Sequence, residues 1–194
     1  MTARPLDEEF FARPVGEVAP ALLGAVIVVD GVGGEIVEVE RYQQDDPASH
    51  SFRGPTPRSA VMFGPPGRLY VYRSYGIHWC ANVVCEPEGA GAAVLLRAVA
   101  PRFGLERMRE RRGRVPDRRL ASGPGRLCAA LGIDGGMNGS VVGEGPVRIA
   151  AGDPVERVLV GPRIGISVAT ERPWRFGVGG SPHLSRPFPE AAAA

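Results

Sequence analysis

Lysine does not occur in the 194-residue sequence, so all 23 basic residues are arginine. Enzymes that form a Schiff base with their substrate use an amine as the nucleophile, most often that of a lysine. That chemistry is excluded for every side chain here, and only the N-terminal amine remains for it. The abundance of Ala, Gly, Pro and Arg indicates a GC-rich coding sequence as the general cause of the bias, but the chemical consequence holds whatever the cause.

Cysteine, histidine and long apolar runs are also scarce. Three cysteines are an odd set, which fits a reducing compartment better than a disulfide scaffold, and buried packing is their expected role. The three histidines are scattered and form no ligand quartet with the cysteines, so no metal is expected. No run of about 18 apolar residues predicts a membrane span, and the acidic N-terminus lacks a signal-peptide pattern. We therefore expect a cytoplasmic protein that does not engage a membrane.

Several nucleotide and nucleophile motifs are missing as well. The sequence has no Walker-type or dinucleotide-binding glycine pattern, so no cofactor is predicted. It has no G-x-S-x-G motif, so a serine triad on a sharp elbow is not indicated. The segment GPGRL at 123–127 opens a predicted helix, where a phosphate could bind, but a simple helix start is the favoured interpretation.

The pattern of apolar and turn residues predicts one α+β domain over residues 1–194. The length fits one domain, the 44% hydrophobic content suffices for a core, and the net charge is only +2. Helices are expected in two pieces over 5–23, then over 103–113 and 122–134; strands are expected over 25–30, 35–42, 69–85 (a hairpin), 92–101, 145–152, 163–169 and 174–180. A long irregular loop is expected over 43–67, and residues 186–194 are expected to be a flexible tail.

The predicted hairpin reads LYVYRSYGIHWCANVVC and places a tyrosine at its turn. Hairpin tips are usually wet, and their residues are usually small and polar. Tyr75 at the corner, beside Gly76, is therefore unusual. Its position raises the question of what an exposed aromatic side chain contacts there.

Five residues stand out as candidates for chemistry. Glu40 and Tyr42 lie two apart and share one face of a strand near its end, an arrangement suited to a general base beside a stacking group. Taken alone, an exposed strand glutamate is the more ordinary interpretation. His50 follows in the loop, whereas Asn82 and Arg97 interrupt apolar strands. Polar groups that converge in an apolar setting are typical of a small-molecule or base pocket.

At this level of detail the sequence resembles a known family. The resemblance rests on VERYQQDDPASHS (39–51), TPRSAVMFGPPGRLYVYRSYGIHWCANVV (56–84), AVLLRAVAP (93–101), SGPGRLCAALGI (122–133), RIGI (163–166) and FGVGGSPHLS (176–185), in that order and spacing. These blocks are similar to those of the alkyladenine DNA glycosylases, also called 3-methyladenine or methylpurine DNA glycosylases. The resemblance covers about residues 15 to 185 and matches the compact bacterial members of the family.

The resemblance implies a fold, a partner and a reaction. The fold is a curved antiparallel sheet with surrounding helices and a protruding β-hairpin, without metal or cofactor. The partner is double-stranded DNA containing damaged purines, bound by a monomer. The reaction is hydrolysis of the N-glycosidic bond of 3-methyladenine, 7-methylguanine, hypoxanthine or ethenoadenine, after the nucleotide has been flipped out of the duplex.

The resemblance also implies residue roles. Glu40 matches the glutamate that activates the attacking water. Tyr42, His50 and Tyr72 match the groups that enclose the flipped base, and Asn82 matches the residue that crowds the 2-amino group of normal guanine. Tyr75 matches the tyrosine that enters the duplex, and Arg97 matches an arginine beside the target nucleotide. Arg58, Arg73 and Arg97 are the expected DNA-backbone contacts, together with part of the arginine-rich segment 102–126.

The absence of lysine adds a prediction of its own. Glycosylases that also cut the DNA strand work through an amine, so we expect a monofunctional glycosylase without lyase activity. Two alternatives are weighed against this function. A nucleic-acid-binding β module would need no carboxylate in its base slot, and a carbohydrate hydrolase would normally need two carboxylates, for which only Glu38 could accompany Glu40.

Overall fold

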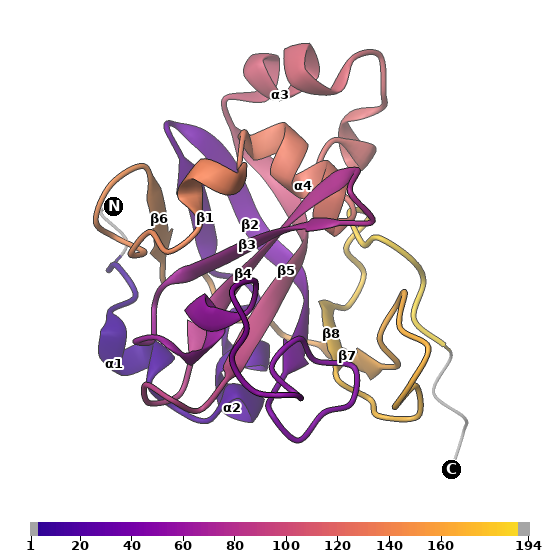
Figure 1. The fold of residues 1–194 in the computed structure, drawn as a ribbon. Helices are drawn as coiled ribbons and strands as arrows, with labels where there is room; N and C mark the ends of the chain where they lie inside the picture. The colour runs from indigo at the N-terminus through magenta and orange to yellow at the C-terminus, as the bar shows by residue number, and fades with distance from the viewer. Residues whose placement is uncertain (1–3, 190–194) are drawn as a thin grey trace.

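The centre of the molecule is an antiparallel sheet built around β2 (Val32–Tyr42) and β5 (Ala92–Phe103). The computed structural model describes residues 4–189. The remaining strands are β1 (Val26–Val29), β3 (Leu69–Ser74), β4 (His78–Cys85), β6 (Val147–Ala150), β7 (Val158–Gly161) and β8 (Arg175–Val178). The order is β3-β4-β5-β2-β1-β6, with β8 also pairing with β2 and β7 pairing with β8. The sheet curls as it crosses the molecule (Figure 1), which confirms the predicted α+β fold with a curved antiparallel core.

Strand β2 organises the curvature because it pairs along both edges. One edge runs beside β5, and the other edge pairs first with β1, through 32–35, and then with β8, through 38–40. The register between β2 and β5 shifts at Gly33/Gly34 and again around Glu38. Such irregularities bend a strand and increase its twist. The bend at Glu38 falls directly before the candidate residue Glu40.

Alternation along the strands gives the sheet two unlike faces. The main core takes Leu69 and Val71 of β3, Ala81, Val83 and Cys85 of β4, and Ala92, Val94 and Leu96 of β5. The residues between them face the other way, and there a small second cluster joins Met62, Tyr70, Val84 and Ala93. This second face also carries the polar residues that interrupt the strands, because side chains two apart share a face.

The helices cover the first face. They are α1 (Glu8–Phe11), α2 (Val15–Ala21), α3 (Leu105–Arg112) and α4 (Pro124–Leu131), and all four contribute to the main core. α4 begins at a proline, which is favoured in the first turn, and ends at Gly132 in the left-handed conformation (φ 78°). Figure 1 shows α3 and α4 toward one end of the sheet and α1 and α2 toward the other. The predicted helices are confirmed.

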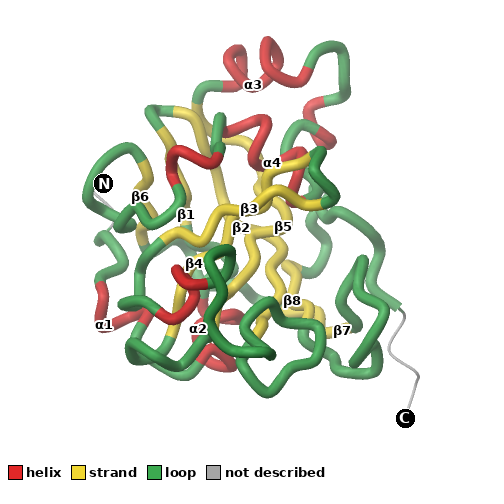
Figure 2. The backbone as a smooth tube through the Cα atoms, viewed as in Figure 1, coloured by secondary structure: helices red, strands yellow, loops and turns green. Residues whose placement is uncertain are grey.

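The second face is covered by irregular chain. The segment between β2 and β3 has one short 3-10 turn, Ala60–Phe63, and is otherwise loop (Figure 2), as predicted for 43–67. The segment 162–174 is also irregular. The prediction of a strand over 163–169 was therefore wrong, and the sequence patterns missed β7. Arg163 and Ile164 bind side chains of β2 and its following loop instead of a neighbouring strand.

The described part of the expected flexible tail is packed. The carbonyl oxygens of Arg186 and Pro187 accept hydrogen bonds from Arg175, and the Phe188 ring lies 3.8 Å from the Arg175 guanidinium carbon. The rest of that tail, 190–194, lies outside the described residues. No helix among residues 4–189 is long and apolar enough to cross a membrane.

Candidate active site

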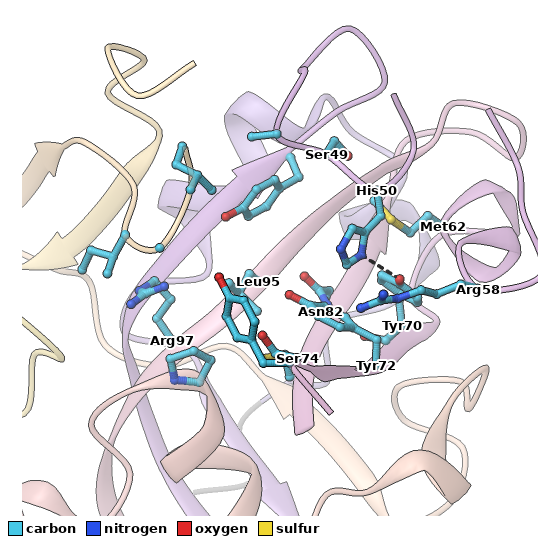
Figure 3. Close-up of a pocket in the computed structure, with 18 residues that line it drawn as sticks. Ser49, His50, Arg58, Met62, Tyr70, Tyr72, Ser74, Asn82, Leu95 and Arg97 are labelled. Carbon is cyan, nitrogen blue, oxygen red and sulfur yellow. Dashed lines mark hydrogen bonds between the residues drawn. The ribbon is translucent and has the colours of Figure 1, made fainter. Parts of the chain in front are cut away.

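A cavity of about 600 Å³ opens on the second face of the sheet. Its floor comes from adjacent strands, with Tyr70 and Tyr72 on β3, Cys80 and Asn82 on β4, Leu95 and Arg97 on β5, and Tyr42 at the end of β2. Its walls come from the loop residues 48–50, from Arg58 and Met62, and from 164–166. Figure 3 shows the labelled side chains converging from these elements. The structure thus brings together seven predicted site residues around one space: Tyr42, His50, Arg58, Tyr72, Tyr75, Asn82 and Arg97.

Glu40 is fully buried and does not line the cavity itself, but it contacts Tyr42, Arg97 and Ile164, which do. Its Oε1 accepts a hydrogen bond from the Ile164 backbone N–H at 2.8 Å. Its Oε2 accepts one from the Tyr42 hydroxyl at 2.9 Å and lies 3.2 Å from an Arg97 guanidinium nitrogen. The interpretation of Glu40 as an exposed strand residue is wrong, because a charged partner from β5 and two hydrogen-bond donors make its burial tolerable.

The surroundings of Glu40 favour its protonated form relative to water. Burial raises the pKa of the carboxyl group, while Arg97, the Ile164 N–H and the Tyr42 hydroxyl oppose that rise. Burial also raises the pKa of Tyr42, and the neighbouring Glu40 charge adds to the effect. A carboxylate with a raised pKa is a stronger proton acceptor than one in water, which suits a general base.

Arg97 is shared between two buried carboxylates. Its Nε donates to Glu38 Oε1 at 3.0 Å, and one terminal nitrogen lies 3.2 Å from Glu40 Oε2. The other terminal nitrogen donates to the Ser185 hydroxyl at 3.3 Å. The predicted contact of Arg97 with the DNA backbone stays a prediction. The guanidinium lines the cavity but already has three partners within the protein.

An aromatic wall stands on the β3 side of the cavity. Tyr70 and Tyr72 stack with their ring centroids 5.4 Å apart, and the His50 ring meets Tyr72 edge-on at 4.6 Å. His50 Nδ1 and the Tyr70 hydroxyl share a hydrogen bond of 2.9 Å (Figure 3). Partial burial, helped by the nearby Arg58 charge, lowers the pKa of His50, so the imidazole is neutral at pH 7. A neutral, fixed ring suits stacking against a planar base.

Asn82 occupies the middle of the floor. It lies opposite Tyr70 on β3 and opposite Leu95 on β5, and Leu95 in turn lies opposite Glu40. These four residues therefore form one row across the sheet. The Asn82 Nδ2 donates to the Tyr70 carbonyl oxygen at 2.9 Å, which fixes the orientation of the buried amide. A fixed amide in a cavity floor can discriminate between ligands by shape and by hydrogen bonding.

The hairpin tip stands at the rim of the cavity. Tyr75 is 87% exposed and Ile77 is 67% exposed, although both are large and apolar. Tyr75 has a φ of 50° and Gly76 a φ of 68°, so the turn uses two successive left-handed positions. Glycine adopts that conformation freely, but an aromatic residue there is strained. The predicted corner is confirmed, with the turn over 75–77.

Arg58 and Arg73 lie near the cavity and the hairpin. The Arg58 guanidinium carbon is 5.2 Å from the Tyr72 ring centroid, and one of its nitrogens donates to the Arg73 carbonyl oxygen. The Arg73 guanidinium packs over the Trp79 ring at 5.3 Å, on the face of the hairpin opposite Tyr72. Their predicted contacts with DNA phosphates stay predictions.

Sequence reasoning missed three groups at the site. Tyr70 was predictable from its spacing of two residues before Tyr72 on one strand. The Glu38–Arg175 contact and the Arg163–Asp46 pair had no local signal, because their members lie far apart in the sequence. Arg163 is held by both Asp46 oxygens and presents the neighbouring Ile164 N–H to Glu40.

Comparison with known proteins adds an independent line of information. The sequence profile described as methylpurine-DNA glycosylase (MPG) matches residues 9–182. A protein of Rhodopseudomonas palustris, provisionally named 3-methyladenine DNA glycosylase, is 57% identical over 184 residues, which cover 95% of this chain and 89% of that protein. Proteins of the same provisional name from Nitrosospira multiformis and Nitrobacter winogradskyi are 58% and 55% identical, covering 93% and 97% of this chain and 93% and 90% of their own lengths.

Proposed function

Because the chain belongs to the methylpurine-DNA glycosylase family of DNA-repair enzymes, we propose that it removes damaged purines from double-stranded DNA by hydrolysing the N-glycosidic bond. The proposed substrates are 3-methyladenine, 7-methylguanine, hypoxanthine and ethenoadenine. The observation that carries the mechanism is the fully buried Glu40 under an aromatic cavity on the second face of the sheet. A module that only binds nucleic acid gains nothing from a desolvated carboxylate at that position.

The proposed chemical role of Glu40 is that of general base. A water held at the carboxylate gives a proton to Glu40 while its oxygen bonds to the sugar C1′, and the purine leaves with the electrons of the broken C–N bond. The carboxylate also stabilises the positive charge that develops on the sugar. Glu40 Oε2 already contacts the Tyr42 hydroxyl and Arg97, whereas within residues 4–189 Oε1 accepts only from the Ile164 N–H, so Oε1 has a lone-pair position left for the water.

The cavity is the proposed seat of the flipped base. Tyr42, Tyr72 and His50 supply aromatic surfaces that offset the cost of unstacking, which is a few kcal/mol. Asn82 is the proposed filter against the 2-amino group of normal guanine. Tyr75 is the proposed wedge that fills the gap left in the duplex, because side chains inserted between base steps stabilise an opened helix.

The decisive experiment compares base release by three proteins from duplexes that contain hypoxanthine or a methylated purine. We expect release by the wild type and a loss of about 10²- to 10⁴-fold with Glu40→Gln, the range for a general base. Glu35→Gln is the matched control, because Glu35 lies on the same strand and pairs with the exposed Arg102. Equal rates for Glu40→Gln and wild type would refute the assignment of the base.

The same experiment discriminates the alternatives. A wild-type protein that binds the damaged duplex but releases no base would be a nucleic-acid-binding module. The carbohydrate-hydrolase alternative loses support, because Glu38 is fully buried and is held by Arg97, Arg175 and Ser185, so it does not offer a second free carboxylate.

We also propose that the enzyme is monofunctional. No lysine side chain is present to attack the sugar, so the strand should stay intact after base release. Borohydride reduction during turnover of a damaged duplex tests this proposal. We expect no covalent protein–DNA adduct, and a trapped adduct would show that an amine, namely the N-terminal one, forms a Schiff base.

A further inference from the structure

A buried charged cluster contains Glu38, a residue that touches neither the cavity nor the solvent. Its Oε1 accepts hydrogen bonds from Arg97 Nε at 3.0 Å and from the Ser185 hydroxyl at 2.7 Å, and lies 3.4 Å from an Arg175 nitrogen. Its Oε2 accepts from the Ser185 backbone N–H. A carboxylate oxygen has two lone-pair positions, so the three donors around Oε1 crowd that oxygen, while Oε2 accepts one hydrogen bond.

Arg97 connects the Glu38 carboxylate to Glu40. The Nε edge of the guanidinium faces Glu38 and a terminal nitrogen faces Glu40, while the Ser185 hydroxyl holds the remaining terminal nitrogen. The guanidinium is planar and its donors have a fixed geometry, so anchoring one edge determines where the other edge points. Arg97 is only 5% exposed, and three protein groups hold its nitrogens.

We propose that Glu38 is a positioning residue for base release, which anchors Arg97 and shares its charge so that the Glu40 carboxylate is held in place and still accepts a proton. This inference rests on the proposed function of Glu40. A single arginine facing a single glutamate would stabilise the carboxylate and weaken it as a base. When two glutamates share one arginine, Glu40 keeps the contact that orients it. It also remains a stronger proton acceptor than it would be as the only partner of Arg97.

The charges around Glu40 support these two roles, in which Arg97 orients Glu40 and Glu38 partly neutralises Arg97. The titratable and charged groups that act on it come from every neighbouring element: Glu38 and Tyr42 on β2, Cys80 on β4, Arg97 on β5, Arg175 on β8 and Arg163 before the 164–166 wall. The Glu38 charge raises the pKa of Glu40, and Arg97 lowers it. Neutralising Glu38 therefore lowers the pKa of Glu40 and makes it a weaker base.

The C-terminal segment takes part in this cluster. Ser185 lies beyond the stretch 9–182 that matches the family profile, yet it supplies two of the donors on Glu38 and one acceptor for Arg97. The neighbouring Arg186 and Pro187 carbonyl oxygens bind Arg175, which is also in contact with Glu38. Residues 185–187 therefore contact three charged members of the cluster, namely Glu38, Arg97 and Arg175.

The test is the pH profile of single-turnover base release, with enzyme in excess over damaged duplex, for wild type, Glu38→Gln, Glu38→Asp and Ser185→Ala. For Glu38→Gln we expect a plateau rate about tenfold lower and an acid limb displaced to lower pH, with the duplex Kd within about threefold of wild type. For Glu38→Asp, which keeps the charge but shortens the anchor, we expect a similar loss in plateau rate and an unmoved acid limb. Ser185→Ala changes no charge and is the matched control, with an unmoved acid limb.

The outcomes separate this inference from its premise. If the wild type releases no base, the proposed function fails. If the wild type is active and Glu38→Gln is slower at every pH by one factor with an unmoved acid limb, Glu38 only supports the fold, and the inference is wrong. Should Glu38→Gln not fold, Glu38→Asp decides: a wild-type plateau rate overturns the anchor role, and a lowered rate with an unchanged Kd and an unchanged thermal stability supports it.

Discussion

The floor of the cavity and the tip of the hairpin are built on opposite principles. Behind the floor, Glu38 and Glu40 are fully buried, and their carboxylate oxygens bind donors from β2, β5 and two C-terminal segments. At the tip, Tyr75 and Ile77 expose most of their surface, and Tyr75 has a strained backbone. The floor is complete before any ligand arrives, whereas the apolar surface of the tip is left for a partner to cover.

The base of the hairpin is nevertheless packed against neighbouring segments. A side chain added at Gly125, in the first turn of α4, would come within 2.9 Å of the His78 Cβ, and one added at Gly135 would come within 2.7 Å of the Trp79 ring. Both contacts lie on β4 just below the tip. A packed base below an exposed tip would hold Tyr75 in position for the insertion into a duplex that we propose for it.

The first prediction tests the tip and carries the largest effect. Tyr75→Ser removes the proposed wedge, and a stacked aromatic contributes roughly 1–3 kcal/mol per base, so we expect base release to slow by about 10- to 100-fold. Release from a duplex with ethenoadenine, whose fluorescence rises on unstacking, would report flipping and cleavage together. Ile77→Ser is the matched control, because Ile77 lies in the same turn and is also exposed. Equal slowing by both variants would assign the effect to a general apolar surface and not to Tyr75.

The second prediction concerns discrimination by the floor. Asn82→Ser shortens the side chain and leaves room beside the Tyr70 carbonyl oxygen, so we expect the preference for damaged purine over normal guanine to fall by about tenfold. The measurement is the ratio of the single-turnover rates on the two duplexes. The rate on the damaged duplex is the internal control, and an unchanged ratio would contradict the role of Asn82 as a filter.

The sequence predicted a region well where its contacts join residues close together in the chain, and poorly where they join residues far apart. The hairpin and its tip follow from local alternation and from Gly76, and both were correct. The burial of Glu40 was not predictable from its strand, because its partner Arg97 lies 57 positions further along the chain. The apolar alternation of RIGISVA over 163–169 indicates a strand, but the Ile164 N–H binds Glu40 and the Arg163 side chain binds Asp46. Long-range polar contacts thus override a local pattern, and they do so at the candidate site.

The third prediction tests whether charges near the tip hold the DNA. Arg73→Ala should weaken the binding of damaged and of undamaged duplexes equally, by a few-fold. It should also reduce the steepness of the plot of log K against log salt concentration by about one. Arg4→Ala is the matched control, because Arg4 is exposed and joins Ala151 after β6, the edge of the sheet away from the hairpin. Fluorescence anisotropy over a salt series gives both slopes. If the slope for Arg73→Ala equals that of the control, Arg73 does not contact a phosphate.

The last prediction has the smallest effect on rate but a definite sign. Tyr42→Phe keeps the ring that faces the cavity and removes the hydroxyl that donates to Glu40 Oε2. That hydrogen bond stabilises the charged carboxylate and lowers its pKa, so its removal raises the pKa of Glu40. Since the reaction needs Glu40 ionised, the acid limb should move to higher pH, with the plateau rate within about threefold of wild type because the stacking ring remains.

This displacement is opposite to the one expected for Glu38→Gln, and the two variants can therefore be combined. If both act on the Glu40 carboxylate, the acid limb of the double variant should lie between those of the single variants, close to that of the wild type. If Tyr42→Phe leaves the acid limb unmoved, the group that titrates in the reaction is not the carboxylate bound by Tyr42. The proposed role of the Glu40 carboxylate as the titrating base would then be wrong, whereas the proposed insertion of the hairpin tip into the duplex would be unaffected.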